Sequence, residues 1–137
     1  MGAAQKVFLA VPTHSGEIGV ATFMCVVTFS VEATRRGMNV VLNCRHGDSL
    51  IPNARNIQFA EFLKSDCTDF LTVDADVSGD ADQFFRLLSH PVDLVGGGYR
   101  YKRDEEDYPM EWKPAAQLWA DPENGLLEVH GVPTGFM

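Results

Sequence analysis

The stretch 70–76 constrains this chain more than any other. It opens with the run Phe-Leu-Thr-Val and ends in Asp74 and Asp76. Such a run predicts a strand that is buried on both faces, as in a parallel sheet. Alternate side chains of a strand point to the same face, so the two carboxylates would project together from its C-terminal tip.

Two interpretations of this acid pair stay open. Open α/β sheets bind ligands at the carboxyl ends of their strands, and carboxylates there suit Mg²⁺ or Mn²⁺. At ~3.3 Å per residue the acids start about 6.6 Å apart, so one would ligate the ion while the other acts through water or a ligand hydroxyl. Alternatively, the acids only begin the loop 77–80 as turn formers.

The rest of the chain alternates strand and helix patterns at short spacing. Further strands are predicted at 7–11, 40–44 and 92–95, with helices between them that Ser15 and Ser49 would cap. A helix from about Asp80 to Ser89 and a short antiparallel strand at 126–129 complete the pattern. The 137 residues therefore predict one α/β domain with a mostly parallel sheet flanked by helices.

The longest apolar run, 18–31, has 14 residues and is too short to cross a membrane. Its apolar residues recur at helical spacing, and they are Val20, Phe23, Met24, Val27 and Val31. We interpret the run as a core helix, and we expect no transmembrane segment.

Charge and cysteine content limit the partners and the location. A net charge of −8 argues against non-specific binding to nucleic acid or to an anionic membrane. An acidic protein that binds phosphates needs a metal or well-placed basic side chains. Cys25, Cys44 and Cys67 form no CxxC pair, so neither a zinc site nor a disulfide framework is expected. A reducing, cytoplasmic location fits best.

Other polar residues are predicted to reach the same sheet edge. Arg55 would lie on the second turn of the helix after strand 40–44. From there its guanidinium group could form two parallel hydrogen bonds to a phosphate or carboxylate. Taken alone, its position favours a structural ion pair with Glu61, Asp66 or Asp74. Thr13 and His14 follow the first strand, and His14 is a ligand, a base or only a solvated turn residue.

The glycines and aromatic residues that follow the predicted strand 92–95 are less specific. Gly96–Gly98 is no dinucleotide fingerprint, and it predicts a close approach of the backbone to a ligand or a helix. Tyr99, Tyr101 and Trp112 could stack on a sugar or base, or could form a small satellite core.

Together these motifs resemble a family. An apolar strand ends in Val-Pro-Thr, a G-x-S-x-x-x-x-A-R-N helix start begins at Gly47, and a later strand ends in Val-Asp-Ala-Asp. This order resembles the nucleotide-sugar half of a GT-A fold glycosyltransferase, near glycosyltransferase family 2. The resemblance covers about residues 7–102, and the closing Pro-Thr-Gly-Phe is similar to a segment on that family's acceptor side.

The resemblance implies metal-dependent transfer of a sugar from a nucleotide-diphosphate donor to a glycan, protein or small-molecule acceptor. Asp76 would be the direct ligand of Mn²⁺ or Mg²⁺ at the diphosphate. Asp74, the first acid of the DXD motif, would complete the metal-binding pair and contact ribose or sugar hydroxyls. Pro12 and Thr13 would lie along the nucleoside, and Arg55 would border the base and phosphates.

The sequence departs from that family in two places. Residues 43–45 are Asn-Cys-Arg where the family often has an acid that reads the base, so the resemblance does not extend to uracil recognition. The family also extends further, so we expect 103–137 to begin the acceptor side without completing it. The catalytic base is unassigned, and the acids left on that side are Glu111, Glu123 and Glu128.

Three expectations follow from a short acceptor side. The chain should bind the nucleotide-sugar donor but transfer the sugar slowly. The alternative function is that of a non-catalytic nucleotide-sugar-binding module. The apolar end at Val132, Phe136 and Met137 should leave an uncovered patch that favours self-association or disorder there. A flavodoxin-like phosphoacceptor domain is the other rival, but it requires acids where this chain has Pro12, Thr13 and His14.

Overall fold

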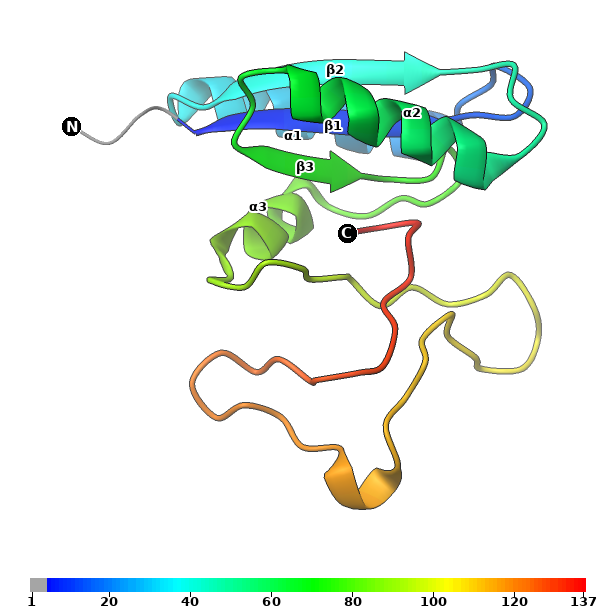
Figure 1. Cartoon of the computed structure of the whole chain (residues 1–137), viewed down its shortest axis with the longest axis vertical. Coiled ribbons are helices and arrows are strands. Elements are labelled where there is room, and N and C mark those ends of the chain that lie inside the picture. Colours follow the sequence, from blue (N-terminus) through cyan, green and yellow to red (C-terminus); the bar gives the residue numbers. More distant parts are fainter. Residues whose placement is uncertain (1–4) are drawn as a thin grey trace.

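The computed structural model describes residues 5–137 and has a three-stranded parallel sheet in the order β2-β1-β3 (Figure 1). The strands are β1 (Lys6–Pro12), β2 (Asn39–Arg45) and β3 (Asp69–Thr72). Val7 of β1 is opposite Val40 of β2 and Asp69 of β3. The predicted α/β class is therefore confirmed, and the carboxyl ends of all three strands meet at one edge.

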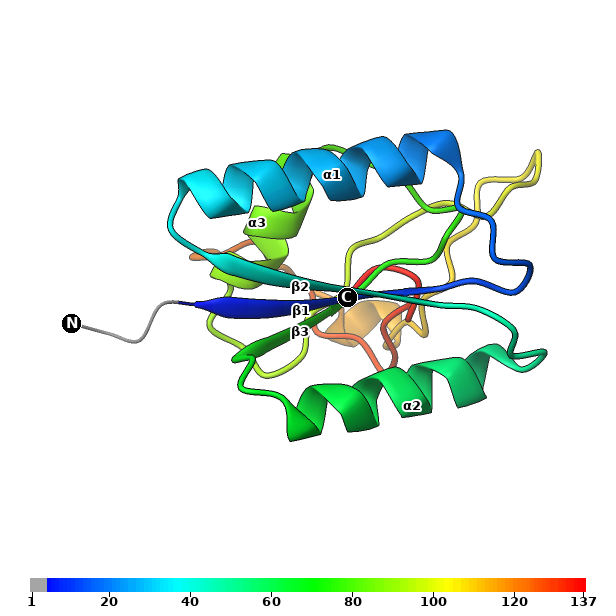
Figure 2. The same cartoon turned by 90° about the horizontal axis from the view of Figure 1, so that it is seen from above.

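Helices cover both faces of this sheet. Figure 2 shows α1 (Val20–Arg35) on one face and α2 (Ile51–Lys64) on the other, with α3 (Ala81–Ser89) on the side of α1. The 3₁₀ helix η1 (Ala115–Gln117) lies in the C-terminal third of the chain. In residues 5–137 no helix combines the length and the apolar character needed to cross a membrane.

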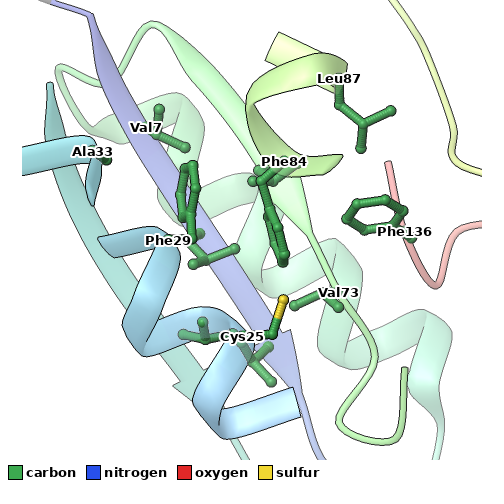
Figure 3. Close-up of a cluster of buried hydrophobic side chains, with 12 residues drawn as sticks. Val7, Cys25, Phe29, Ala33, Val73, Phe84, Leu87 and Phe136 are labelled. Atoms are coloured by element: carbon green, nitrogen blue, oxygen red, sulfur yellow. The ribbon is translucent and has the colours of Figure 1, made fainter. Parts of the chain in front are cut away.

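The core lies on the α1 side of the sheet and is rich in phenylalanine (Figure 3). Phe29 of α1 stacks on Phe84 of α3 at a centroid distance of 4.9 Å. Phe136 meets Phe84 edge-to-face at 5.0 Å. After Lys6, every residue of β1 is buried, because strands flank β1 on both sides and helices cover both faces.

The prediction of a core helix at 18–31 is confirmed only in part, because α1 turns a different side to the sheet. Its buried residues are Thr22, Cys25, Val26, Phe29 and Ala33. The stripe that the sequence singled out (Val20, Phe23, Met24, Val27, Val31) is 38 to 79% exposed. Small residues on the buried side let the helix approach the strands closely, and Phe29 fills the space beside α3.

The two predicted serine caps are wrong. Helix α1 has Gly19 at its N-cap and α2 has Leu50, and neither helix has a side-chain cap hydrogen bond. The predicted start of α3 is confirmed, since Asp80 and Gln83 form a reciprocal capping box. The backbone N–H of Gly19 donates to the Ala75 carbonyl at 2.8 Å, which fixes the start of α1 against the loop after β3.

The predicted strand 92–95 does not form, because the position beside β3 is taken by the C-terminal residues. Phe136 forms an antiparallel bridge with Val73, and Met137 exchanges two hydrogen bonds with Thr72. On the far side of this segment, the Gly97 N–H donates to the Phe136 carbonyl at 2.9 Å. The segment 134–137 thus lies between β3 and the glycine run.

This placement also corrects two further expectations. The uncovered apolar patch predicted at the C-terminal end is absent, because Phe136 is buried and Val132 and Met137 are half-buried. In place of a strand at 126–129 there is only an isolated antiparallel bridge between Ala120 and Leu127.

Candidate functional site

One hollow of about 450 Å³ opens at the carboxyl ends of β1 and β3, and four of the predicted site residues line it. They are Pro12, Thr13, Asp74 and Asp76. The other lining residues are His14, Ser15, Glu17, Gly19, Ile51 and Ala75. We call it the first hollow. The expected convergence of the first loop and the acid pair on one edge is confirmed.

Backbone hydrogen bonds hold the floor of the first hollow in place. Thr13 is buried, and its N–H donates to the Arg45 carbonyl at 2.7 Å, which continues the β1–β2 pairing past the strand ends. The Thr13 hydroxyl accepts a hydrogen bond from the Gly16 N–H at 3.1 Å. The loop after β1 is therefore tied to β2 and closed by a hydrogen bond of its own.

Asp74 is held by Arg55, which lies on the second turn of α2. The guanidinium Nη2 is 2.5 Å from Asp74 Oδ1, and the two side chains are only 22% and 27% exposed. The structural ion pair that the sequence left open is thus present, and it brings Arg55 to the acids. Buried Arg55 Nε has no hydrogen-bond partner within residues 5–137.

The Asp76 side chain, unlike that of Asp74, is largely accessible to solvent, with 69% of its surface exposed. Its only ion-pair partner among residues 5–137 is Lys102, whose Nζ lies 2.8 Å from Oδ2 and whose side chain is 73% exposed. Exposed pairs of this kind contribute little stability and exchange readily with solvent and ions. Asp76 is therefore the carboxylate that an incoming ligand can reach.

A second hollow, of about 490 Å³, meets the first at the two acids. Its lining residues are Asp74, Asp76, Val77, Ser78, Tyr99, Arg100, Tyr101 and Lys102. The sequence did not indicate Lys102 as a site residue. Asp76 is distant from it in the sequence, and no spacing rule links the two residues. Two hollows that share one acid pair can hold two parts of one ligand.

Tyr99 lies closer to the acids than its sequence position indicates. A Cβ placed on Gly135 would lie 2.3 Å from the Tyr99 hydroxyl oxygen and 2.8 Å from Asp74 Oδ2, so all three groups converge. Burial raises the pKa of Tyr99, and the nearby Asp74 charge raises it further. Tyr99 is therefore a neutral hydrogen-bond donor beside the acid at neutral pH. Trp112, by contrast, lines a separate groove.

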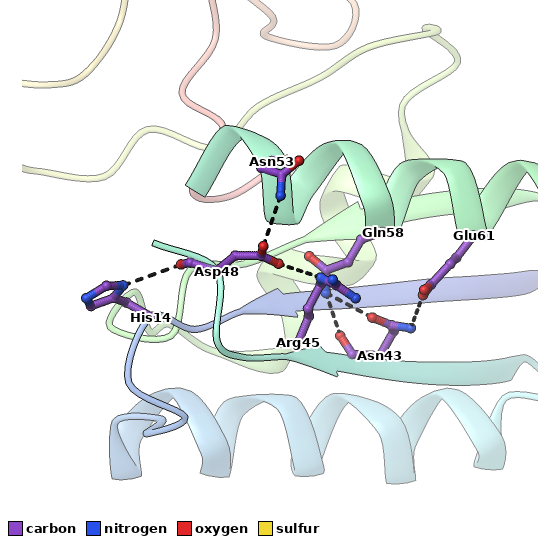
Figure 4. A network of polar contacts seen from close by, with 7 residues as sticks. All are labelled: His14, Asn43, Arg45, Asp48, Asn53, Gln58 and Glu61. Carbon is purple, nitrogen blue, oxygen red and sulfur yellow. Dashed lines mark hydrogen bonds and ion pairs between the residues drawn. The ribbon is translucent and has the colours of Figure 1, made fainter. Parts of the chain in front are cut away.

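A polar network borders the first hollow on the β2 side (Figure 4). Arg45 Nε donates to Asp48 Oδ2 at 2.7 Å, and Asn53 donates to Oδ1 at 2.9 Å. The Arg45 guanidinium lowers the pKa of Asp48. His14 Nδ1 lies 3.4 Å from the Asp48 carbonyl, so the network reaches the first loop.

Asn43, near the end of β2, is held by side chains of α2. Buried Gln58 of α2 donates to the Asn43 carbonyl at 2.9 Å and to its side-chain oxygen at 3.0 Å. Asn43 donates in turn to Glu61 at 2.8 Å. These contacts turn Asn43 toward α2.

The donor set fits a cation that arrives with phosphate oxygens. Residues 5–137 contain no group of three His, Cys, Asp or Glu side chains placed to hold a metal. Asp74 already gives one oxygen to Arg55, so Asp76 is the open ligand. Mg²⁺ is commonly held by one or two carboxylates together with substrate phosphates and water. The residues present meet that requirement.

The three glutamates that the sequence left as possible bases in 103–137 do not line these hollows. They are Glu111, Glu123 and Glu128. Glu128 instead pairs with Lys113 at 2.6 Å.

No protein-family model matches this chain, and the searches of curated proteins and of solved structures also found no match.

Proposed function

We propose that this chain binds a nucleotide-diphosphate sugar together with Mn²⁺ or Mg²⁺ and transfers the sugar to an acceptor, as a GT-A-type glycosyltransferase similar to family 2. The observation that carries the proposal is the shared lining of the first hollow by Thr13, Asp74 and Asp76. Ligands of open α/β sheets bind at this edge.

The charges around the acids suit a diphosphate. The two carboxylates alone would repel it, but Arg55 neutralises Asp74 and Lys102 lies beside Asp76. A bound divalent cation would supply the Lewis acid that stabilises the departing diphosphate. Asp76 would hold the cation, Arg55 would keep Asp74 oriented, and Lys102 would then be free to donate to a phosphate oxygen.

The second candidate function is that of a nucleotide-sugar-binding module without turnover. It is favoured by one observation: none of the three acids on the acceptor side lines either hollow at the acid pair. A base for the acceptor hydroxyl is typically worth about 10²–10⁴-fold in rate. Binding and transfer therefore have to be measured separately.

Calorimetric titration with UDP, GDP and ADP tests the binding step. We expect binding of at least one of them with Mn²⁺ or Mg²⁺ and none in excess EDTA. Asp76→Asn should weaken the affinity at least about tenfold, equivalent to ~1.4 kcal/mol. The matched control is Asp82→Asn on α3, where the side chain is 89% exposed and outside both hollows. Equal affinity in EDTA would refute the proposal.

Release of nucleoside diphosphate from a panel of sugar nucleotides, with and without sugar acceptors, tests the transfer step. Release that depends on both Asp76 and the cation supports the enzyme. Cation-dependent binding without release from any donor supports the binding module.

A further inference from the structure

The outward side of α1 is an apolar stripe that the rest of the described chain leaves uncovered. It consists of Val20, Phe23, Met24, Val27 and Val31, each between 38 and 79% exposed. In Figure 2, α1 forms the outer layer on its side of the sheet, and no other described element lies beyond it. The run Val20–Val31 contains no charged residue. Contiguous exposed apolar surface of this kind marks an interaction site.

The spacing within the stripe matches a helix partner. Val20, Met24, Val27, Val31 and the exposed Thr34 are separated alternately by four and three residues. This is the spacing of the a and d positions in a coiled coil, whose side chains interlock with those of a second helix. A flat ligand or an extended peptide would not require it.

The charges at the two ends of the stripe select an antiparallel orientation. Glu17 precedes α1 and Arg35 lies in its last turn, and both are exposed. Arg35 has only a long contact of 3.5 Å with Glu32. Arg36 is turned toward α3, where it lies over the Phe85 ring, and does not contribute to the stripe. When two copies of α1 are antiparallel, the Glu17 end of each meets the arginine end of the other, and the helix dipoles are opposed. The stripe is therefore complementary to itself, in apolar pattern and in charge.

We propose that two copies of this chain associate through α1 in an antiparallel, two-fold symmetric helix pair, with Val27 of each copy at the axis. Phe23 of one copy then packs near Val31 of the other, and Val20 packs near Thr34. One helix stripe buries less than the ~1,600 Å² of a standard interface. We therefore expect a weak dimer, with a dissociation constant of roughly 10–100 µM.

Sedimentation velocity over a concentration series tests the association. The unmodified chain should shift from monomer to dimer, and Val27→Glu should abolish the shift because it places two like charges at the axis. Thr28→Glu is the matched control, since Thr28 is exposed on the same helix but lies outside the stripe. A chain that stays monomeric at ~500 µM, or a dimer that tolerates Val27→Glu, would overturn the proposal.

Single cysteines on α1 test the orientation without weakening the interface. The background protein for these variants has exposed Cys44 and half-buried Cys67 replaced by Ser, and it keeps buried Cys25. Under mild oxidation Val27→Cys should form a disulfide-linked dimer. Val20→Cys should not, because 14 residues at 1.5 Å rise separate the two sulfurs by roughly 20 Å in the antiparallel pair.

Two results would identify a different arrangement. Cross-linking of Val20→Cys as strongly as Val27→Cys would show a parallel pair and refute the two-fold axis at Val27. A chain that remains monomeric but binds phosphatidylcholine–phosphatidylglycerol vesicles, in a manner abolished by Val27→Glu, would replace the second copy by a lipid surface.

Discussion

Arg55 Nη2 lies 2.5 Å from Asp74 Oδ1, so an arginine on α2 fixes the first acid of the pair that follows β3. Both side chains are about three-quarters buried, which makes the pair more than a surface contact. It links the helix on one face of the sheet to the edge where the two hollows meet. The acid pair therefore depends on α2 for its geometry.

A double-mutant cycle measures this link. Arg55→Gln leaves a mostly buried carboxylate without its partner and should lower the free energy of unfolding by about 1–3 kcal/mol. Arg55→Gln combined with Asp74→Asn should recover part of the loss, with a coupling energy of about 1 kcal/mol in urea unfolding. The exposed pair Arg103–Asp107 is the control and should couple by less than ~0.5 kcal/mol. Equal coupling in the two pairs would contradict the structural role of Asp74.

Lys102 is expected to compete with a divalent cation for Asp76. The exposed pair is worth about 0.2–1 kcal/mol, so Lys102→Met should raise the Mn²⁺ affinity of the nucleotide-free chain about 1.4- to 5-fold. Paramagnetic broadening of the Asp76 amide signal during a Mn²⁺ titration reports this affinity. Lys113→Met is the control: it also removes one lysine charge, but beside Glu128, and it should leave the Mn²⁺ affinity unchanged. A lower Mn²⁺ affinity in Lys102→Met would mean that Lys102 does not compete for Asp76.

The network around Asp48 should lose its order in acid. Arg45 lowers the pKa of the Asp48 carboxyl in the folded chain, first of all through its hydrogen bond. The contribution of this pair to stability is therefore complete above the ordinary Asp pKa of ~3.9 and is lost as pH falls through the lower folded value. The carboxyl ¹³C shift of Asp48 should titrate below pH ~3.9. In Arg45→Gln it should move back toward the ordinary value, and an unmoved titration would argue against the pairing.

Two adjacent glycines should differ in their tolerance of a methyl group. A Cβ on Gly97 would lie 2.3 Å from the ring of buried Phe136, whereas one on Gly98 would meet only the flexible end of Met110 at 3.0 Å. Gly97→Ala should therefore cost about 1–3 kcal/mol in thermal or urea unfolding, as overpacking does. Gly98→Ala should cost less than ~0.5 kcal/mol. Similar values for the two variants would contradict the close approach of Phe136 to the glycine run.

The strands and their common edge were predictable because their signals are local. The apolar runs at 7–11 and 70–73 permit little except buried strands, and the acids at 74 and 76 mark where the second one ends. The parallel arrangement then brings Thr13 and Asp74 to one hollow.

Other features could not be predicted because they depend on competition between distant segments. Helix α1 is apolar on two sides, so periodicity cannot tell which side meets the sheet, and the presence of Phe84 and Phe85 decides it. The segment 92–95 looks like a strand, but 134–137 takes the place beside β3. For Arg55, the position alone favoured an ion pair but left three possible acidic partners, and only the geometry selects Asp74.

The antiparallel pairing of 135–137 with the residues around Asp74 has a consequence for how the protein is made. The Asp74 N–H donates to the Gly135 carbonyl, and Thr72 exchanges hydrogen bonds with Met137. Contacts between segments so distant in sequence form late, since the entropy of closing a long loop opposes them. A ribosome-bound chain can therefore assemble β1, β2 and β3 while the backbone at Asp74 still lacks its outer partner. The acid pair reaches its final geometry only after residue 137 has been synthesised and has left the exit tunnel.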